Sequence, residues 1–168
     1  MRRILSMILL LILTPFLAAD ARIKVKDRIP NSYPGYCVWC SLETLGRHQG
    51  VKGLFGLTDW YKRSGLDGGA AERQVQRQLD MLGIRHRQQW GGTYDSRSVK
   101  RSCQEGNGCV VGFVGRSYGH AVILTAWRDG IVRYVDPNWP AWDMQASAAW
   151  YLQNWDGWAV FLEQKDAD

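Results

Sequence analysis

Residues 31–42 read Asn-Ser-Tyr-Pro-Gly-Tyr-Cys-Val-Trp-Cys-Ser-Leu, and this stretch joins a turn to the start of a helix. The segment Tyr33-Pro34-Gly35-Tyr36 is typical of a turn. After Cys37, apolar residues recur at helical spacing until Gly46 and Gly50 end the run (Val38, Leu42 and Leu45). The pattern therefore predicts a helix that begins at Cys37.

A cysteine at the start of a helix is well placed for nucleophilic chemistry. The first N–H groups of a helix have no partners within it, and the positive end of the helix dipole stabilises a thiolate. A catalytic thiolate also needs a nearby imidazole and a group that orients the imidazole. Cys37 is therefore a candidate nucleophile, and the rest of the chain must supply the other two groups.

The second half of the chain offers both groups on neighbouring strands. Short apolar or alternating runs between turn residues predict strands at 109–114, 120–127, 131–135 and 158–162. Arg128-Asp129-Gly130 is typical of a tight hairpin turn. His120 opens one strand of that hairpin and Asp136 follows the other, so strand pairing can set the two side chains together.

The arrangement of helical and strand patterns indicates the fold class. Helices are expected mainly in the N-terminal half and the strands in the C-terminal half, where they favour an antiparallel sheet. No repeat or linker divides the halves, so residues 20–168 are expected to form a single α+β domain. The expected helices cover residues 37–48, 58–64, 70–82, 97–104 and 144–154.

These motifs resemble those of papain-like cysteine peptidases, and most closely the bacterial C39-like branch. The likeness rests on Asn31-x5-Cys37, on Gly119-His120 before a hairpin, and on Val135-Asp136-Pro137. It implies N-terminal helices, with the nucleophile at a helix start, packed on a C-terminal antiparallel sheet. It also implies a peptidase that cleaves peptide bonds through a thioester acyl-enzyme, without a cofactor or metal. Cys37 would attack, His120 would act as base, Asp136 would orient it and Asn31 would help to hold the oxyanion.

Cys40 competes with Cys37 for the role of nucleophile. In the papain-type pattern C-G-[SA]-C-[WY] the second cysteine attacks. If Cys40 attacked here, the oxyanion position six residues earlier would be Pro34, which has neither a side-chain donor nor an N–H. If Cys37 attacks, that position is Asn31, whose amide can donate to developing negative charge. This argument favours Cys37.

Asn138 competes with Asp136 for the third position, because papain-type enzymes use Asn there. Asp136 is favoured because it directly follows a strand and its charge would stabilise an imidazolium. The sequence also departs from the C39-like pattern in two places. Asn31 stands where Gln is commoner, and Val38 stands where Gly often follows the nucleophile.

Residues 1–19 predict export. Arg2 and Arg3 precede a short apolar run that ends in small residues, which is the layout of a secretory signal peptide. An uncleaved membrane anchor is the alternative; with cleavage, no stable membrane association and a periplasmic or extracellular location are expected. The formal charge of +5 includes those two arginines, and the other basic residues are mixed with acids. The charge pattern therefore gives no case for nucleic-acid binding, and a peptide or protein substrate is the expected partner.

The four cysteines leave other classes open. Cys37-x2-Cys40 suits a thiol–disulfide redox protein, and together with Cys103 and Cys109 it suits a zinc site, although the second pair is spaced more widely than usual. A local Cys103–Cys109 disulfide is a further alternative. A papain-like domain that binds without cutting is also open, because of the Asn31 and Val38 departures. The sequence does not determine the oligomeric state.

Overall fold

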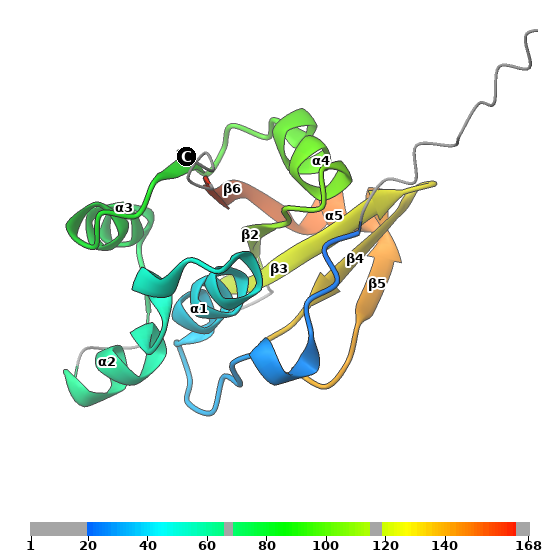
Figure 1. Cartoon of the computed structure of the whole chain (residues 1–168). Coiled ribbons are helices and arrows are strands. Elements are labelled where there is room, and N and C mark those ends of the chain that lie inside the picture. Colours follow the sequence, from blue (N-terminus) through cyan, green and yellow to red (C-terminus); the bar gives the residue numbers. More distant parts are fainter. Residues whose placement is uncertain (1–19, 66–68, 115–118, 164–168) are drawn as a thin grey trace, which may run out of the picture.

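The computed structural model of the chain describes residues 20–65, 69–114 and 119–163 (Figure 1). The expected signal peptide at 1–19 lies outside these residues. Within the described ranges, no helix combines the length and hydropathy that a membrane span requires.

A six-stranded antiparallel sheet forms the centre of the described structure, with strand order β1-β6-β2-β3-β4-β5. All pairs of neighbouring strands run antiparallel, so the strands predicted for the C-terminal half do form the expected sheet. The strands are β1 (His86–Gln89), β2 (Cys109–Val114), β3 (Gly119–Arg128), β4 (Ile131–Val135), β5 (Met144–Ser147) and β6 (Trp155–Leu162).

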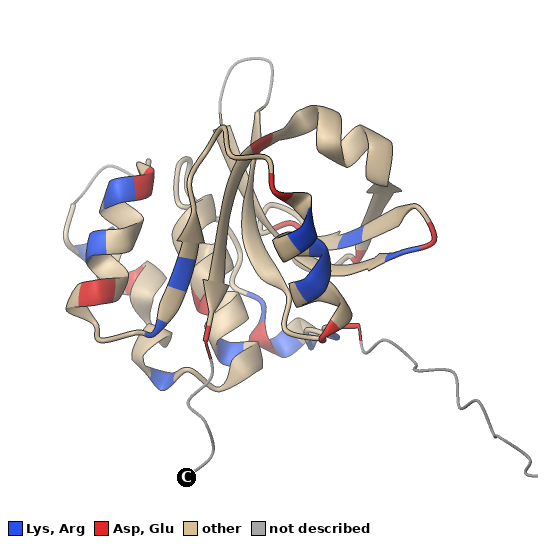
Figure 2. Ribbon diagram, turned by 90° about the horizontal axis from the view of Figure 1, so that it is seen from above, with Lys and Arg blue, Asp and Glu red and all other residues tan. Residues whose placement is uncertain are grey.

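Helices cover both faces of the sheet (Figures 1 and 2). On one face lie α1 (Cys37–Gln49), α2 (Leu57–Arg63) and α3 (Glu72–Met81), and on the other lie α4 (Ser96–Gln104) and α5 (Ala148–Asn154). Two short 3-10 turns, η1 (Val25–Asp27) and η2 (Lys52–Leu54), lead into and out of α1. The α+β class and the helix start at Cys37 are as predicted.

The alternation of strand side chains divides the interior into two cores. Successive residues of a strand point to opposite faces, so Val110 packs beneath α1 while Val111 packs beneath α4 and α5. On β3, Ile123 and Leu124 divide in the same way. Helix α1 contributes Trp39 to the first core, where this side chain is fully buried and stacks on Tyr61 of α2. This packing fixes α1, and therefore Cys37, against the sheet.

Two segments differ from the prediction. Residues 144–147 were expected to begin a helix, but they form the edge strand β5, because Val132 and its neighbours on β4 pair with them. The helix begins only at Ala148, where the Ser147 side chain accepts from the Trp150 N–H. Strand β1 was not predicted at all: His86–Gln89 is polar, and it becomes a strand by pairing with β6.

The β3–β4 hairpin sets the register on which the site depends. Asp129 and Gly130 both have positive φ (52° and 74°), which gives the two-residue turn that matches strand twist. Further along, Ala126 pairs with Arg133 but Leu124 pairs with Tyr134, so Thr125 is an extra residue on β3. Its carbonyl accepts instead from the Ala21 N–H at 2.9 Å.

This bulge sets the register of β4 just before Asp136. A shift of one residue in register moves every following side chain to the other face of the sheet. Beyond the bulge Val135 pairs with Ile123, and both side chains lie in the core beneath α1. Asp136 follows Val135 directly, and its Oδ1 lies 2.9 Å from His120 Nε2.

Candidate active site

Cys37 is the first residue of α1, and the helix end around it lacks a side-chain cap. Tyr36 at the N-cap makes no capping hydrogen bond, and no acidic residue lies in the first turn. The Val38 N–H instead forms a backbone hydrogen bond with the Cys37 sulfur. The unpaired N–H groups and the helix dipole are thus free to favour negative charge on the thiol.

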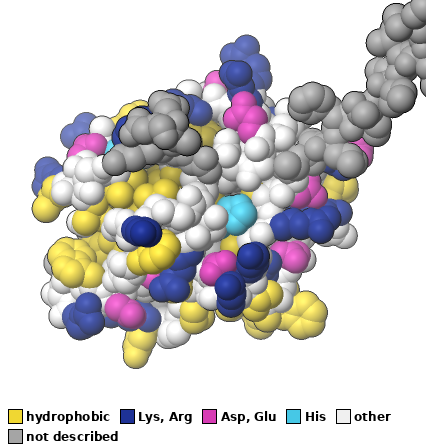
Figure 3. All heavy atoms as spheres, in the orientation of Figure 1, with side chains coloured by type: hydrophobic (Ala, Val, Ile, Leu, Met, Phe, Trp, Pro, Cys, Tyr) yellow, Lys and Arg dark blue, Asp and Glu magenta, His cyan; other side chains and the backbone are white. Residues whose placement is uncertain are grey.

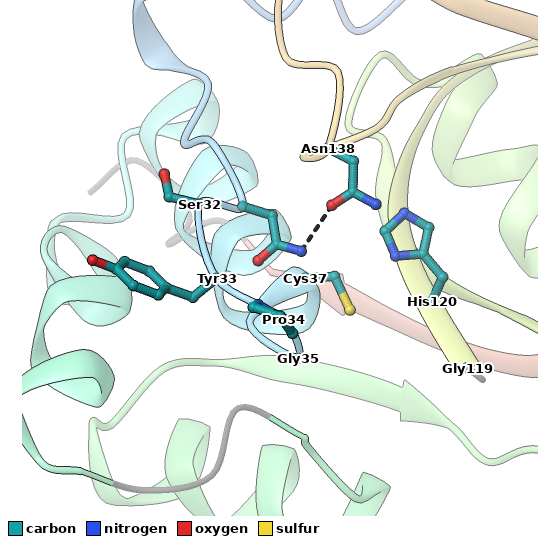
Figure 4. Close-up of a pocket in the computed structure, with 9 residues that line it drawn as sticks. Ser32, Tyr33, Pro34, Gly35, Cys37, Gly119, His120 and Asn138 are labelled. Carbon is teal, nitrogen blue, oxygen red and sulfur yellow. Dashed lines mark hydrogen bonds between the residues drawn. The ribbon is translucent and has the colours of Figure 1, made fainter.

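Cys37, His120 and Asp136 lie together as a chain of contacts. The His120 side chain hydrogen-bonds the Cys37 thiol, and its Nε2 lies 2.9 Å from Asp136 Oδ1. The ring nitrogen that remains for Cys37 is Nδ1, and Figure 4 shows the ring turned toward the sulfur. All three groups are largely shielded: Cys37 is 8% exposed, and the His120 and Asp136 side chains are 16% and 15% exposed.

The pKa values of the thiol and the imidazole shift in opposite directions. Burial alone would raise the pKa of Cys37, but hydrogen bonds with the His120 side chain and the Ala121 backbone, together with the His120 charge, bring it below 9.0. Burial alone would lower the pKa of His120, but Asp136 and Cys37 raise it to about 9. Both shifts favour a thiolate beside an imidazolium, the state from which such a thiol attacks.

Cys40 is in a different environment one helical turn away. It is fully buried, and its thiol donates to the Pro30 carbonyl at 3.6 Å. Burial raises the pKa of Cys40 to about 12, despite the opposing hydrogen bond with Thr58 and the charge of Lys62. A thiol with this pKa is almost entirely protonated at neutral pH, so the geometry favours Cys37 as the candidate nucleophile.

Asn31 lines the same hollow as Cys37, and its side-chain amide is engaged in a hydrogen bond. Its Nδ2 donates to Asn138 Oδ1 at 2.8 Å, a bond drawn as the dashed line in Figure 4. Asn138 therefore contacts Asn31, while the carboxylate of Asp136 takes the bond to His120. Of the two alternatives for the third position, the contact with His120 favours Asp136.

Two hollows meet at the Cys37–His120 pair. The first, of about 480 Å³, lies on the side of Asn31 and Asn138, and the second, of about 520 Å³, lies on the side of α3 and β6. Gly35, Cys37, Gly119 and His120 line both. Small residues form much of the second wall, so an extended chain could pass close to the sulfur (Gly69, Ala70, Ala71 and Gly112).

Arg28 belongs to the framework of the site, and no pattern in the sequence pointed to it. Its buried guanidinium donates to the Ile23 carbonyl, to the Pro140 and Trp142 carbonyls at 3.0 and 3.2 Å, and to Asp143. These bonds tie the segment before α1 to the loop after β4, which carries Asp136. Only the tertiary structure brings these carbonyls together.

The cysteines do not fit a shared zinc site. Cys37 lies in the core beneath α1, whereas Cys103 and Cys109 lie in the core on the opposite face of the sheet. All four thiols are free in the structure, and the Cys103 and Cys109 side chains hydrogen-bond one another. Because the sheet separates the pairs, four thiolates cannot surround one ion.

Figure 3 shows how charge is distributed on one face of the molecule. Basic and acidic side chains are mixed over this face, and hydrophobic side chains are exposed between them. Among the described residues seen there, no single-sign stripe of the kind that binds a nucleic-acid backbone appears.

Comparison with solved structures gives the fold a name. A double-glycine-motif protease from an AMS/PCAT transporter, solved in complex with the leader peptide, superposes with a TM-score of 0.65 over 89% of this chain and 96% of that chain, at 16% identity. The peptidase domain of Streptococcus ComA, a bifunctional ABC transporter involved in quorum sensing, gives 0.65 over 82% and 97%, at 15% identity. The chain has the fold of the papain-like C39 peptidase domains.

The likeness to C39 peptidase domains extends to the peptidase domain of Streptococcus mutans ComA, with a TM-score of 0.54 and 14% identity over 82% of this chain. Neither the protein-family models nor the curated proteins give a match to the sequence. The likeness is thus one of fold.

Proposed function

We propose that the protein is an exported cysteine peptidase that hydrolyses peptide bonds. The observation that carries this proposal is the contact chain from the Cys37 thiol at the start of α1 through His120 to Asp136, placed where two hollows meet. The C39-type fold supports the same reaction class.

In the proposed reaction, His120 Nδ1 takes the proton of Cys37 and the thiolate attacks the substrate carbonyl carbon. A C–S bond forms, and the carbonyl oxygen becomes negative. The C–N bond then breaks, the leaving amine takes the proton from His120, and a thioester remains. Water, deprotonated by His120, attacks the thioester, and the Cys37 thiol is regenerated with release of the acid. Asp136 holds the imidazole in the required tautomer through Nε2 throughout.

The proposed substrate is an extended peptide segment lying across both hollows. The neighbouring solved protease was captured with a leader peptide, which supports a peptide in the corresponding cleft here. The small residues of the second hollow leave room for a backbone to approach Cys37.

Export is proposed from the basic, apolar and small-residue pattern of residues 1–19. If the full chain is produced in a bacterial host, N-terminal sequencing of the exported protein should place the mature end near Ala19–Asp20. A chain that remains in the membrane fraction with Met1 intact would instead support the anchor.

The peptidase proposal is tested by incubating the purified protein with a mixed peptide library and identifying new termini by mass spectrometry. Wild type should generate products that Cys37→Ala and His120→Ala do not. Fast alkylation of Cys37 without any peptide product would favour the non-cutting binding domain. Ready isolation of a reversible Cys37–Cys40 disulfide, with no cleavage, would favour the redox alternative.

A further inference from the structure

We propose that Asn138 is a positioning residue that holds the Asn31 amide for oxyanion stabilisation. The inference rests on the proposed acyl-transfer function and assigns a role that differs from the third-position alternative considered for Asn138. In this inference the turn Asp136-Pro137-Asn138 positions both the base, His120, and the oxyanion donor, Asn31.

Each residue of this turn forms a hydrogen bond with either His120 or Asn31. The Asp136 carboxylate accepts from His120 Nε2 at 2.9 Å and from the Asn138 N–H at 2.8 Å. The Pro137 carbonyl accepts from the Asn31 N–H at 2.8 Å. The Asn138 side-chain oxygen accepts from Asn31 Nδ2, also at 2.8 Å. The backbone and the side chain of Asn31 are thus both tied to the turn that orients the base.

The contact selects one orientation of the Asn31 amide. An amide can present either its oxygen or its NH2 group to a neighbour, and only the NH2 group can stabilise an oxyanion. Asn138 Oδ1 is an acceptor, so it bonds the Asn31 NH2 group and leaves the second N–H of that group for the substrate. Asn31 Oδ1 is buried and has no hydrogen-bond partner within the described structure, so no bond to that oxygen helps to fix the amide.

The position of Asn138 fits this role. Figure 4 shows its amide oxygen turned away from His120, across the mouth of the hollow that Cys37 lines. Asn is one methylene shorter than Gln, so the reach of the Asn31 amide is small and its direction matters more. A donor displaced by about 1 Å can cost on the order of 100-fold in rate.

The test compares two reactions of the same thiol. Acylation by p-nitrophenyl acetate passes through a carbonyl oxyanion, and its rate is read from the burst of p-nitrophenolate. Alkylation by iodoacetamide occurs at a saturated carbon and forms no oxyanion, so it reports only the activated thiol. Asn138→Leu should slow acylation by about 10- to 100-fold and leave the rate and pH profile of alkylation within about twofold of wild type.

Three further variants sharpen the result. Asn138→Asp keeps an acceptor for Asn31 and should retain acylation within a few-fold of wild type. Asn31→Ala should lose about as much as Asn138→Leu, and the double variant should lose little more, because both remove one function. Asn154→Leu is the matched control, because this exposed amide bonds only the Trp150 carbonyl of its own helix among the interactions described.

The outcomes separate this inference from the function beneath it. If Asn138→Leu slows alkylation as much as acylation, or if the losses of Asn31→Ala and Asn138→Leu multiply, the positioning role is wrong while the peptidase proposal stands. If wild type alkylates rapidly but shows no acylation burst, the proposed acyl-transfer function itself fails, and this inference fails with it.

Discussion

Replacing His120 by alanine tests the thiolate–imidazolium pair most directly. The variant removes the side-chain hydrogen bond and the charge that bring the pKa of Cys37 below 9.0, while much of the burial that opposes ionisation remains. The pKa of Cys37 should therefore rise, because the burial that opposes ionisation is no longer offset by His120. The midpoint of the pH–rate profile for alkylation should move to higher pH by the same amount.

The shift translates into thiolate population and rate. At a pH well below both pKa values, each unit by which the pKa rises lowers the thiolate population about tenfold. The alkylation rate should fall less, by about threefold for each unit, because the more basic thiolate is intrinsically more reactive. The midpoint of the pH–rate profile is therefore the decisive quantity, rather than the rate at one pH.

The assay is iodoacetamide labelling of the purified protein from pH 4 to 10, mapped by peptide mass spectrometry. Cys40 is an internal control, because its pKa of about 12 should leave it unlabelled at pH 6. His48→Ala is the matched variant, since His48 lies near the other end of α1. Coincident midpoints for wild type and His120→Ala would refute the pair, and labelling of Cys40 in place of Cys37 would move the nucleophile by one turn.

Three further changes test the framework of the site. Asp136→Asn should lower the pKa of His120 from about 9, as read by NMR titration. A raised His pKa stabilises the fold fully below about pH 6.5, and this stabilisation is lost as the pH rises through about 9. The difference in stability between wild type and Asp136→Asn should therefore be largest near pH 6 and small above pH 9. A difference that does not depend on pH would contradict this reasoning. Arg28→Met leaves the Ile23, Pro140 and Trp142 carbonyls without their donor, so it should lower the free energy of unfolding in urea by about 2–4 kcal/mol. The control Arg133→Met removes a largely exposed ion pair with Asp20 and should lower it by about 0.5 kcal/mol or less. Equal losses in the two variants would show that the buried hydrogen bonds of Arg28 do not stabilise the fold more than an exposed ion pair does. Gly112→Ala places a Cβ on the Asp156 carboxylate and should lower the stability measured by thermal unfolding by about 1–3 kcal/mol. The double variant Gly112→Ala/Asp156→Ala should recover the lost stability. If it does not, the clash lies with another group.

Local signals in the sequence were sufficient for the elements that carry the reactive groups. The turn before Cys37 and the apolar spacing after it predicted α1, because helix starts and periodicity are set by neighbours along the chain. The β3–β4 hairpin was predicted for the same reason, since Asp129 and Gly130 suit a turn with positive φ. The order of cysteine, histidine and aspartate along these elements then indicated a candidate triad.

Local signals failed where a partner strand decides the structure. Polar His86–Gln89 becomes β1 by pairing with β6, and Met144–Ser147 becomes β5 by pairing with β4. His86–Gln89 is polar throughout, and the alternation of Met144–Ser147 covers only four residues before a helical pattern begins. An edge strand needs little apolar surface and takes its hydrogen bonds from its neighbour. Periodicity therefore assigned residues 144–147 to the helix that in fact begins at Ala148.

The sequence by itself determined the reactive groups, the helix that begins at Cys37 and the hairpin between His120 and Asp136. The tertiary structure decided whether those groups meet. The bulge at Thr125, whose carbonyl accepts a hydrogen bond from the Ala21 N–H, sets the register of β4 just before Asp136. Contacts between distant segments likewise join Asn31 to Asn138 and anchor the loop after β4 through Arg28. Register and long-range hydrogen bonds depend on how separate segments pack, and no pattern within a single segment records them.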